Sequence, residues 1–203
     1  MTEGYIKFNC DWEQRQFSFQ NEIFMQLENA RTTLYELRLI GMYPDGIGFG
    51  NISVRIGESL SFIITGSATG QLPKLDRSHY ALVLGYNFAK NFISCTGLTK
   101  ASAESLSHAA VYEALPEVGA VVHVHCLWLW EKLLNALPTT SEAIEYGTPE
   151  MALAIQKLVS KMEITEEKII VMGGHREGIL VFGSDLNEAT NQIIKTFNQY
   201  KND

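Results

Sequence analysis

The stretch KIIVMGGHREGILVF, residues 168–182, decides how the chain can fold. Two short apolar runs rich in β-branched residues, KIIVM and GILVF, indicate strands, and only the five residues GGHRE separate them. A parallel pair would need a crossover of a dozen or more residues, whereas five residues suit a hairpin-like turn between antiparallel strands. The sequence therefore predicts a sheet that is at least partly antiparallel.

Outward from this hairpin, strand and helix patterns are interspersed. Apolar or alternating runs predict further strands at 51–56, 60–65, 79–86, 91–95 and 120–125. Apolar residues recurring every three or four positions predict helices over 19–40, 103–115, 149–162 and 186–197. Thr148 and Asp185 are expected to cap the last two helices, and Ser102 to precede the helix that carries Glu104 in its first turn. The expected fold is an α/β sandwich in which helices pack over a mixed or mostly antiparallel sheet.

The whole chain has the composition of a folded protein, with 46% hydrophobic and 19% charged residues in 203. We expect one domain over residues 1–203. The net charge of -7 is diffuse and no run of Lys or Arg occurs, which argues against nucleic acid or an anionic membrane surface as a partner. No apolar run approaches the roughly 18 to 20 residues of a membrane span, and the first residues do not resemble a signal peptide. Three widely spaced cysteines form neither a disulfide framework nor a zinc motif, so we expect a reducing, cytoplasmic setting.

Two histidines interrupt the apolar strand at 120–125, AVVHVH. Alternate side chains leave the same face of a strand, so His123 and His125 should point the same way. One interpretation is a half-buried strand whose histidines bond to backbone or water. The other is a metal site, with His175 as a third ligand from the glycine-flanked turn. Three imidazoles that leave a fourth position for water or substrate are typical of catalytic zinc.

Carboxylates and small polar residues could complete such a site. Glu104 precedes the histidine strand by one helix and is either a metal ligand, a general acid or base, or a group that stabilises the helix N-terminus. His108 lies four residues on and is a packing or supporting group as readily as a ligand. Clusters at Asn51, Thr65-Gly66 and Ser102 could form a pocket for an anion or a hydroxyl-rich ligand, although such turns often have no role beyond the fold.

The ordered set of these segments resembles the class II aldolase/adducin family. GNISVR, FIITGSATG, ASAESLSHAAVY, AVVHVH, GTPEMA and GGHREGILVFGSDLNEA occur in the family's order, from about Phe49 to Phe197. The resemblance implies a three-layer α/β/α sandwich with a mostly antiparallel central sheet. It also implies Zn2+ or another divalent ion on His123, His125 and His175, with Glu104 as the proton-moving carboxylate. Substrate phosphate would be met by Asn51, Thr65, Gly66 and Ser102, and family members are commonly homotetramers.

The resemblance implies a lyase that acts on a small sugar or sugar-phosphate-like hydroxy-carbonyl compound through an enediolate. Ser102-Ala103-Glu104 stands where many aldolases of the family have Ser-Ser-Glu, and SAESLSH is similar to the branch that dehydrates a methylthio-ketose phosphate. GGHREG replaces the usual Asn-His-Gly, which adds Arg176 and Glu177 beside the third histidine. Tyr146 is the candidate for the family's proton-donating tyrosine.

Two alternatives stand beside the lyase. A non-catalytic interaction domain like the adducin head would be favoured if the histidines were missing, and all three are present. A structural zinc site needs four protein ligands, and Cys126 would leave the opposite face of the strand from His123 and His125.

Overall fold

The computed structural model describes residues 6–57, 59–161 and 168–201 and is built around one eight-stranded sheet. The strand order is β1-β7-β6-β5-β4-β8-β10-β9. β1 runs parallel to β7, and every other neighbouring pair is antiparallel, including β9 and β10 around the 173–177 turn. The predicted mostly antiparallel sheet is confirmed. The strands are β1 (Asn9–Glu13), β4 (Asn51–Arg55), β5 (Phe62–Thr65), β6 (Tyr80–Asn87), β7 (Phe92–Thr96), β8 (Ala120–His125), β9 (Ile169–Val171) and β10 (Gly178–Gly183), with a separate small pair β2 (Gly41–Met42) and β3 (Gly48–Phe49).

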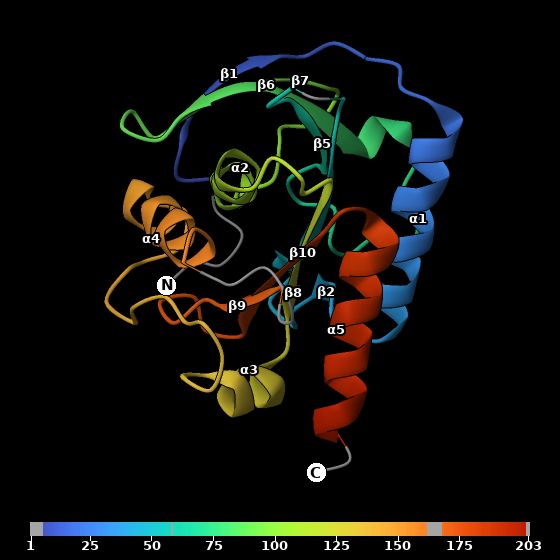
Figure 1. The fold of residues 1–203 in the computed structure, drawn as a ribbon. Helices are drawn as coiled ribbons and strands as arrows, with labels where there is room; N and C mark the ends of the chain where they lie inside the picture. Colours follow the sequence, from blue (N-terminus) through green and yellow to red (C-terminus); the bar gives the residue numbers. More distant parts are fainter. Residues whose placement is uncertain (1–5, 58, 162–167, 202–203) are drawn as a thin grey trace.

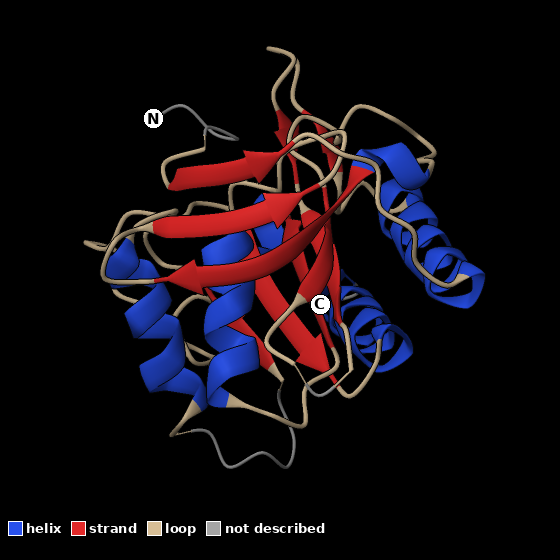
Figure 2. Cartoon of the chain, turned by 90° about the horizontal axis from the view of Figure 1, so that it is seen from above, coloured by secondary structure: helices blue, strands red, loops and turns tan. Residues whose placement is uncertain are grey.

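Helices cover both faces of the sheet, so the molecule has the three layers that were expected. Figure 1 shows α2 and α4 on one side of the sheet and α1 and α5 on the other, and Figure 2 shows the twisted sheet between them from above. Two separate hydrophobic clusters fill the two helix–sheet layers. The helices are α1 (Asn21–Glu36), α2 (Ser105–Ala114), α3 (Leu127–Leu133), α4 (Pro149–Val159) and α5 (Leu186–Lys201), with a short 3-10 turn at Arg77–His79.

Strand β8, in the interior of the sheet between β4 and β10, divides its side chains between these two layers. Ala120, Val122 and Val124 pack in the layer under α1 and α5, whereas Val121 packs in the layer under α2 and α4. Because side chains alternate along a strand, His123 and His125 share the face of Val121. Both histidines are therefore held in the α2 and α4 layer, and the prediction that they share one face of the strand is confirmed.

Two predicted helix starts are confirmed by their hydrogen bonds. The Thr148 hydroxyl accepts from the Met151 N–H at 3.3 Å, with Pro149 in the first helical position of α4. An Asp185 carboxylate oxygen accepts from the Glu188 N–H at 2.8 Å at the start of α5. The expected apolar face of α4 is buried or packed against the core as far as Leu158; its last expected member, Met162, lies outside the described residues.

Other elements differ from the sequence prediction. The first helix ends at Glu36 and not near residue 40, because Arg38 takes a positive φ of 59° and the Leu39 N–H turns back to the Leu34 carbonyl. β1 and α3 were not predicted. Helix α2 begins at Ser105 and not just after Ser102, so Glu104 occupies the N-cap position, and its side chain makes no capping bond.

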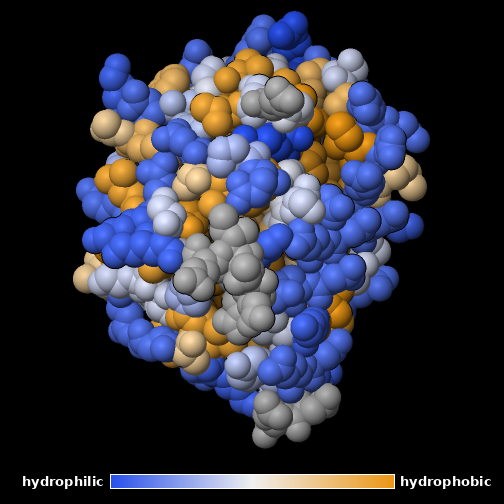
Figure 3. Space-filling view, viewed as in Figure 1, coloured by the Kyte–Doolittle hydropathy of each residue, from blue (hydrophilic) through white to orange (hydrophobic). Residues whose placement is uncertain are grey.

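No helix in the described part of the chain is both long and apolar enough to span a bilayer. The face drawn in Figure 3 is mostly hydrophilic, with hydrophobic residues in small scattered areas.

Candidate active site and metal centre

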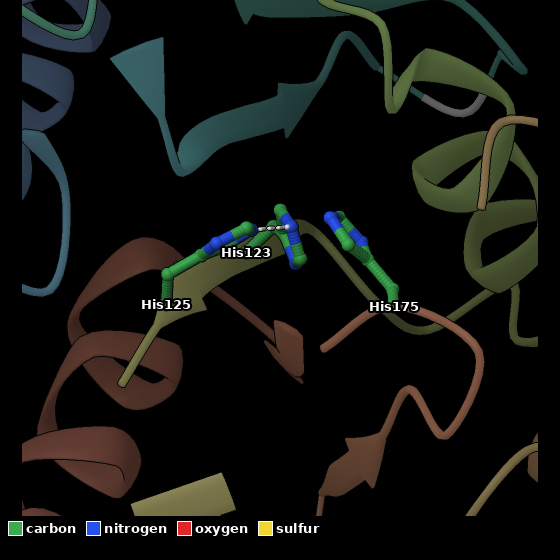
Figure 4. Close-up of side chains that lie close together, drawn as sticks. All are labelled: His123, His125 and His175. Atoms are coloured by element: carbon green, nitrogen blue, oxygen red, sulfur yellow. Dashed lines mark hydrogen bonds between the residues drawn. The ribbon is translucent and has the colours of Figure 1, made fainter. Parts of the chain in front are cut away.

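Three histidines from two distant parts of the sequence meet in one cluster. His123 and His125 come from β8, and His175 comes from the turn between β9 and β10. The Nε2 atoms of His123 and His125 are 3.0 Å apart, and the His175 ring centroid lies 5.0 Å from that of His123 and 4.7 Å from that of His125. Figure 4 shows the three rings turned toward one another. One candidate ligand atom from each ring lies within 4.8 Å of the others, and all three side chains are buried.

This donor set fits a divalent metal ion. Ligand nitrogens at about 2.0 to 2.1 Å around a tetrahedral ion are roughly 3.3 Å apart, so small rotations of the rings would bring all three into range. Burial, together with the neighbouring His125 and His175, holds the pKa of His123 well below its usual value, and neutral imidazole is the form that binds a metal. Cys126 packs in the opposite layer and does not complete a four-ligand structural site.

Glu104 lies beside the histidines, although α2 begins one residue after it. Its side chain is buried, and the Ser107 hydroxyl donates to Oε2 at 2.6 Å. Oε1 is 3.9 Å from His175 Nδ1. The carboxylate is thus close enough to the cluster to exchange a proton with a molecule bound there.

His108 belongs to a different polar network under the site. Its Nδ1 bonds to the Ser53 hydroxyl at 2.7 Å, and that hydroxyl also bonds to the Tyr112 hydroxyl at 2.7 Å. Complete burial lowers the pKa of His108 to about 3, so the ring is neutral. His108 is outside the three-histidine cluster and supports the packing between α2 and β4.

A pocket of about 310 Å³ opens in front of His123 and Glu104. Its lining includes Asn51, Gly66, Ser102 and Tyr146 together with the glycine-rich segments 46–50 and 66–70. The buried Asn51 Oδ1 lacks a hydrogen-bond partner among the described residues, which leaves it available to a polar ligand. Most of the predicted substrate-binding residues are therefore gathered in one pocket with Glu104.

Thr65 and Gly66 make hydrogen bonds within the fold that the sequence did not reveal. Thr65 does not line the pocket, and its hydroxyl accepts from the Ile52 N–H at 3.2 Å. The Gly66 N–H donates to the His79 carbonyl at 2.7 Å and so points away from a ligand. A Cβ at Gly66 would come within 2.2 Å of the Thr99 hydroxyl, so the turn accepts only glycine at this position.

Tyr146 lies directly against the histidines. Its ring stacks on that of His175 at 4.3 Å between centroids and 18° between planes. Lys7 donates to the Tyr146 carbonyl at 3.0 Å, lies 3.7 Å from the ring centroid and forms an ion pair with Glu145 at 2.9 Å. These contacts hold the tyrosine at the pocket wall.

Sequence reasoning missed several residues that shape this site. The Tyr43 hydroxyl bonds to His125 Nδ1, and the Phe49 ring stacks on the His125 ring at 5.5 Å between centroids. The buried Arg31 of α1 donates to the Thr69 carbonyl at 3.0 Å and thereby holds the 66–70 segment from behind. None of these residues has a local sequence signal, because each meets its partner only after folding.

A sandwich with a mostly antiparallel sheet, three clustered histidines and an adjacent carboxylate defines a class II aldolase-like domain. The family described as "Class II Aldolase and Adducin N-terminal domain" matches residues 45–198. The chain belongs to this family, and the expected resemblance from about Phe49 to Phe197 is confirmed.

Curated relatives and solved structures agree with this assignment. The chain is 39% identical over 106 residues to methylthioribulose-1-phosphate dehydratase of Leptospira interrogans, covering 49% of this chain and 43% of that protein. It is 26% identical over 160 residues to L-fuculose phosphate aldolase of Methanocaldococcus jannaschii, covering 72% of this chain and 78% of that protein. The match thus spans less than half the length of the dehydratase. A solved structure of L-fuculose 1-phosphate aldolase shares the fold with a TM-score of 0.67 at 20% identity, over 89% of this chain and 84% of that chain.

Proposed function

We propose that this protein is a divalent-metal-dependent lyase that cleaves or dehydrates a small sugar phosphate or a similar hydroxy-carbonyl compound. The observation that carries the proposal is a cluster of three buried imidazoles whose member His123 lines one pocket together with the Glu104 carboxylate. A non-catalytic interaction domain would not need this set, and the family includes adducin domains as well as aldolases.

Each residue of the site has a proposed role. His123, His125 and His175 would hold the ion, which when bound supplies a Lewis acid for the negative charge that develops on a substrate oxygen. Glu104 would take a proton from the carbon next to the substrate carbonyl in a dehydration, or from the hydroxyl of the following carbon in an aldol cleavage. Tyr146, stacked on His175 and lining the pocket, would return a proton to the reacting molecule.

The rest of the pocket would bind the end of the substrate that does not react. Asn51 and Ser102 line it and offer an amide and a hydroxyl to a phosphate or to sugar hydroxyls. Gly66 would allow the substrate to come close to the backbone, but its N–H, which is bonded to the His79 carbonyl, would not bind the substrate. Thr65 would contribute indirectly, because its hydroxyl accepts from the Ile52 N–H of the neighbouring strand. The names of the two relatives specify phosphorylated ketoses, with aldol cleavage in one and loss of water in the other. Loss of water begins when a base removes the proton on the carbon next to the carbonyl, and aldol cleavage begins when a base removes the proton of the hydroxyl on the following carbon; Glu104 could serve as the base in either reaction.

The proposal extends to finer points that the family resemblance supports. The ion is zinc, since three imidazoles and an open position suit it well. The partner is a small molecule and not nucleic acid, given the diffuse charge of -7. The protein assembles as a homotetramer and works in the cytoplasm, where its three free cysteines stay reduced.

Removal of the metal should abolish turnover. Protein stripped with a chelator is expected to lose cleavage of L-fuculose 1-phosphate, or dehydration of methylthioribulose 1-phosphate, and to regain it when Zn2+ or another divalent ion is added back. The measurement is product formation over a panel of ketose phosphates, with the metal content determined in parallel. Turnover that is equal with and without metal, or no turnover of any panel member by the metal-loaded protein, would contradict the proposal.

Substitution of Ala103 by serine should strengthen phosphate binding. Ala103 lines the pocket between Ser102 and Glu104, and a new hydroxyl there could donate to a phosphate oxygen. Such a bond to a charged group is worth about 1.5 to 3 kcal/mol, on the order of a tenfold to hundredfold gain in affinity. Calorimetry with phosphorylated and unphosphorylated analogues checks this, since only the former should bind more tightly to Ala103→Ser. Equal affinity of the wild type and Ala103→Ser for the phosphorylated analogue would count against phosphate binding at this wall of the pocket.

A further inference from the structure

A chain of two short hydrogen bonds leads away from His125 on the side opposite to the other histidines. The Tyr43 hydroxyl lies 2.8 Å from His125 Nδ1 and donates to Glu177 Oε2 at 2.8 Å. Tyr43 comes from the segment between β2 and β3, and Glu177 is the last residue of the turn that carries His175. Three separated parts of the chain thus converge on one imidazole.

The direction of these bonds fixes where the proton of His125 sits. A carboxylate only accepts, so the single hydroxyl hydrogen of Tyr43 points to Glu177. The Tyr43 oxygen then faces His125 as an acceptor, and Nδ1 must carry the imidazole proton. Nε2 is left with its lone pair, and this is the nitrogen that lies 3.0 Å from His123 Nε2 inside the cluster.

The backbone conformation at Glu177 is unusual and is held by a hydrogen bond next to His125. Glu177 has a φ of +74°, in the left-handed region that residues other than glycine rarely adopt. Its carbonyl accepts from the Cys126 N–H at 3.0 Å, which ties the turn to the residue that follows His125. Strained conformations of this kind persist where surrounding contacts fix them, and they concentrate at functional sites.

The ring of His125 is also held against rotation. Phe49 stacks on it at 5.5 Å between centroids and 25° between planes, and the Tyr43 ring lies 4.5 Å from that of Phe49. The imidazole is therefore fixed in both its plane and its direction before any ion arrives.

We propose that Tyr43 and Glu177 are positioning residues that hold His125 in the Nδ1–H tautomer, so that its Nε2 is presented to the divalent ion. The inference rests on the proposed metal site. It adds to that site two residues, Tyr43 and Glu177, that contact neither the nitrogens proposed to bind the ion nor the pocket. Partners of this kind orient a ligand and increase its basicity, and their loss typically costs 10-fold to 100-fold in metal affinity.

The first test observes the tautomer directly in the metal-free protein. With only five histidines, 15N-labelled imidazoles can be assigned by single His substitutions, and the nitrogen shifts at mildly alkaline pH report which nitrogen is protonated. His125 is expected to be protonated on Nδ1 in the wild type and to shift toward the Nε2–H form in Tyr43→Phe. A wild-type His125 protonated on Nε2, or an unchanged tautomer in Tyr43→Phe, would overturn the inference.

The second test measures metal affinity by competition with a chelator, using Zn2+ alone. Tyr43→Phe and Glu177→Gly are each expected to weaken binding 10-fold to 100-fold, and the double variant to lose no more than Tyr43→Phe, because the pair acts as a unit. Glycine accepts the positive φ at 177, so Glu177→Gly should fold at least as stably as the wild type while binding metal less tightly. If Glu177 had a purely structural role, a variant that keeps wild-type stability would also keep wild-type metal affinity.

Tyr35→Phe is the matched control, because its hydroxyl contacts the Gln71 carbonyl at the surface of α1 and should leave metal affinity unchanged. Wild-type affinity in both Tyr43→Phe and Glu177→Gly would overturn the inference. If the wild type binds no divalent ion, the proposed function fails. The tautomer measurement on the metal-free protein still decides whether Tyr43 and Glu177 determine the tautomer of His125.

Discussion

Replacement of both His123 and His125 by alanine is expected to leave the protein without a bound divalent ion. The two rings supply two of the three imidazoles in the cluster. Zinc binding by four-ligand sites is worth about 10 to 16 kcal/mol, so the loss of two ligands should cost on the order of 5 kcal/mol or more. That is more than a thousandfold in Kd. Metal analysis after dialysis should find one ion per chain in the wild type and none in the double variant.

A matched control and a second variant keep this experiment decisive. His79→Ala removes a half-exposed imidazole that bonds to the Asp76 N–H, away from the cluster, and should keep its ion. His175→Ala changes a residue in a turn and not in strand β8, and this variant should also lose most of its affinity for the ion. Near-UV circular dichroism checks that each variant is folded. Full occupancy in the folded double variant would show that the ion lies elsewhere.

The histidine pair could be anticipated because strand geometry alone relates its members. Positions 123 and 125 are two apart in an apolar strand, so they must share a face whichever neighbours the strand has. His175 was proposed from its glycine-flanked turn and then from the order of family motifs. The fold explains its position, because β8 and β10 are neighbours, with Gly178 paired to His125. The turn before Gly178 therefore has to end beside the strand that carries the pair.

The supporting residues could not be anticipated, because their partners are far away in the sequence. Tyr43 and His125 are separated by 82 positions and meet only when the 41–49 segment lies over the end of β8. Nothing about a tyrosine in a turn distinguishes this residue from a surface residue. Glu177 was noted as a departure from the family pattern, but its target is visible only in the folded chain.

Secondary-structure elements were not predicted where the local hydrophobic pattern is weak or fits both a strand and a helix. β1 has the sequence NCDWE and alternates between exposed and half-buried residues, since it is an edge strand whose parallel partner β7 covers one side only. The short α3 begins directly after β8, and its apolar run LWLWEKL does not distinguish a strand from a buried helix. Glu104 was expected inside the first turn of α2 and is the N-cap residue, which directs its carboxylate to Ser107 and toward His175.

Substitution of Glu104 by glutamine is expected to stop the chemistry while leaving the ion in place. Glutamine keeps the size of the side chain and an oxygen that can accept from the Ser107 hydroxyl, but it cannot take up a proton. Three imidazoles suffice to hold zinc without the carboxylate. The kcat should therefore fall roughly a hundredfold or more, the scale of general acid–base catalysis, with metal content close to that of the wild type.

Steady-state kinetics and metal analysis on the same preparations separate a base from a ligand. Glu113→Gln is the matched control, because Glu113 lies on the same helix, is exposed, and contacts the Gln156 amide at 3.2 Å far from the pocket lining. Its kcat should not change. If Glu104→Gln instead loses its ion and regains activity when excess divalent metal is supplied, the carboxylate is a ligand. The proton must then be carried by another group, and a large loss of kcat in Tyr146→Phe would identify the tyrosine stacked on His175 as that group.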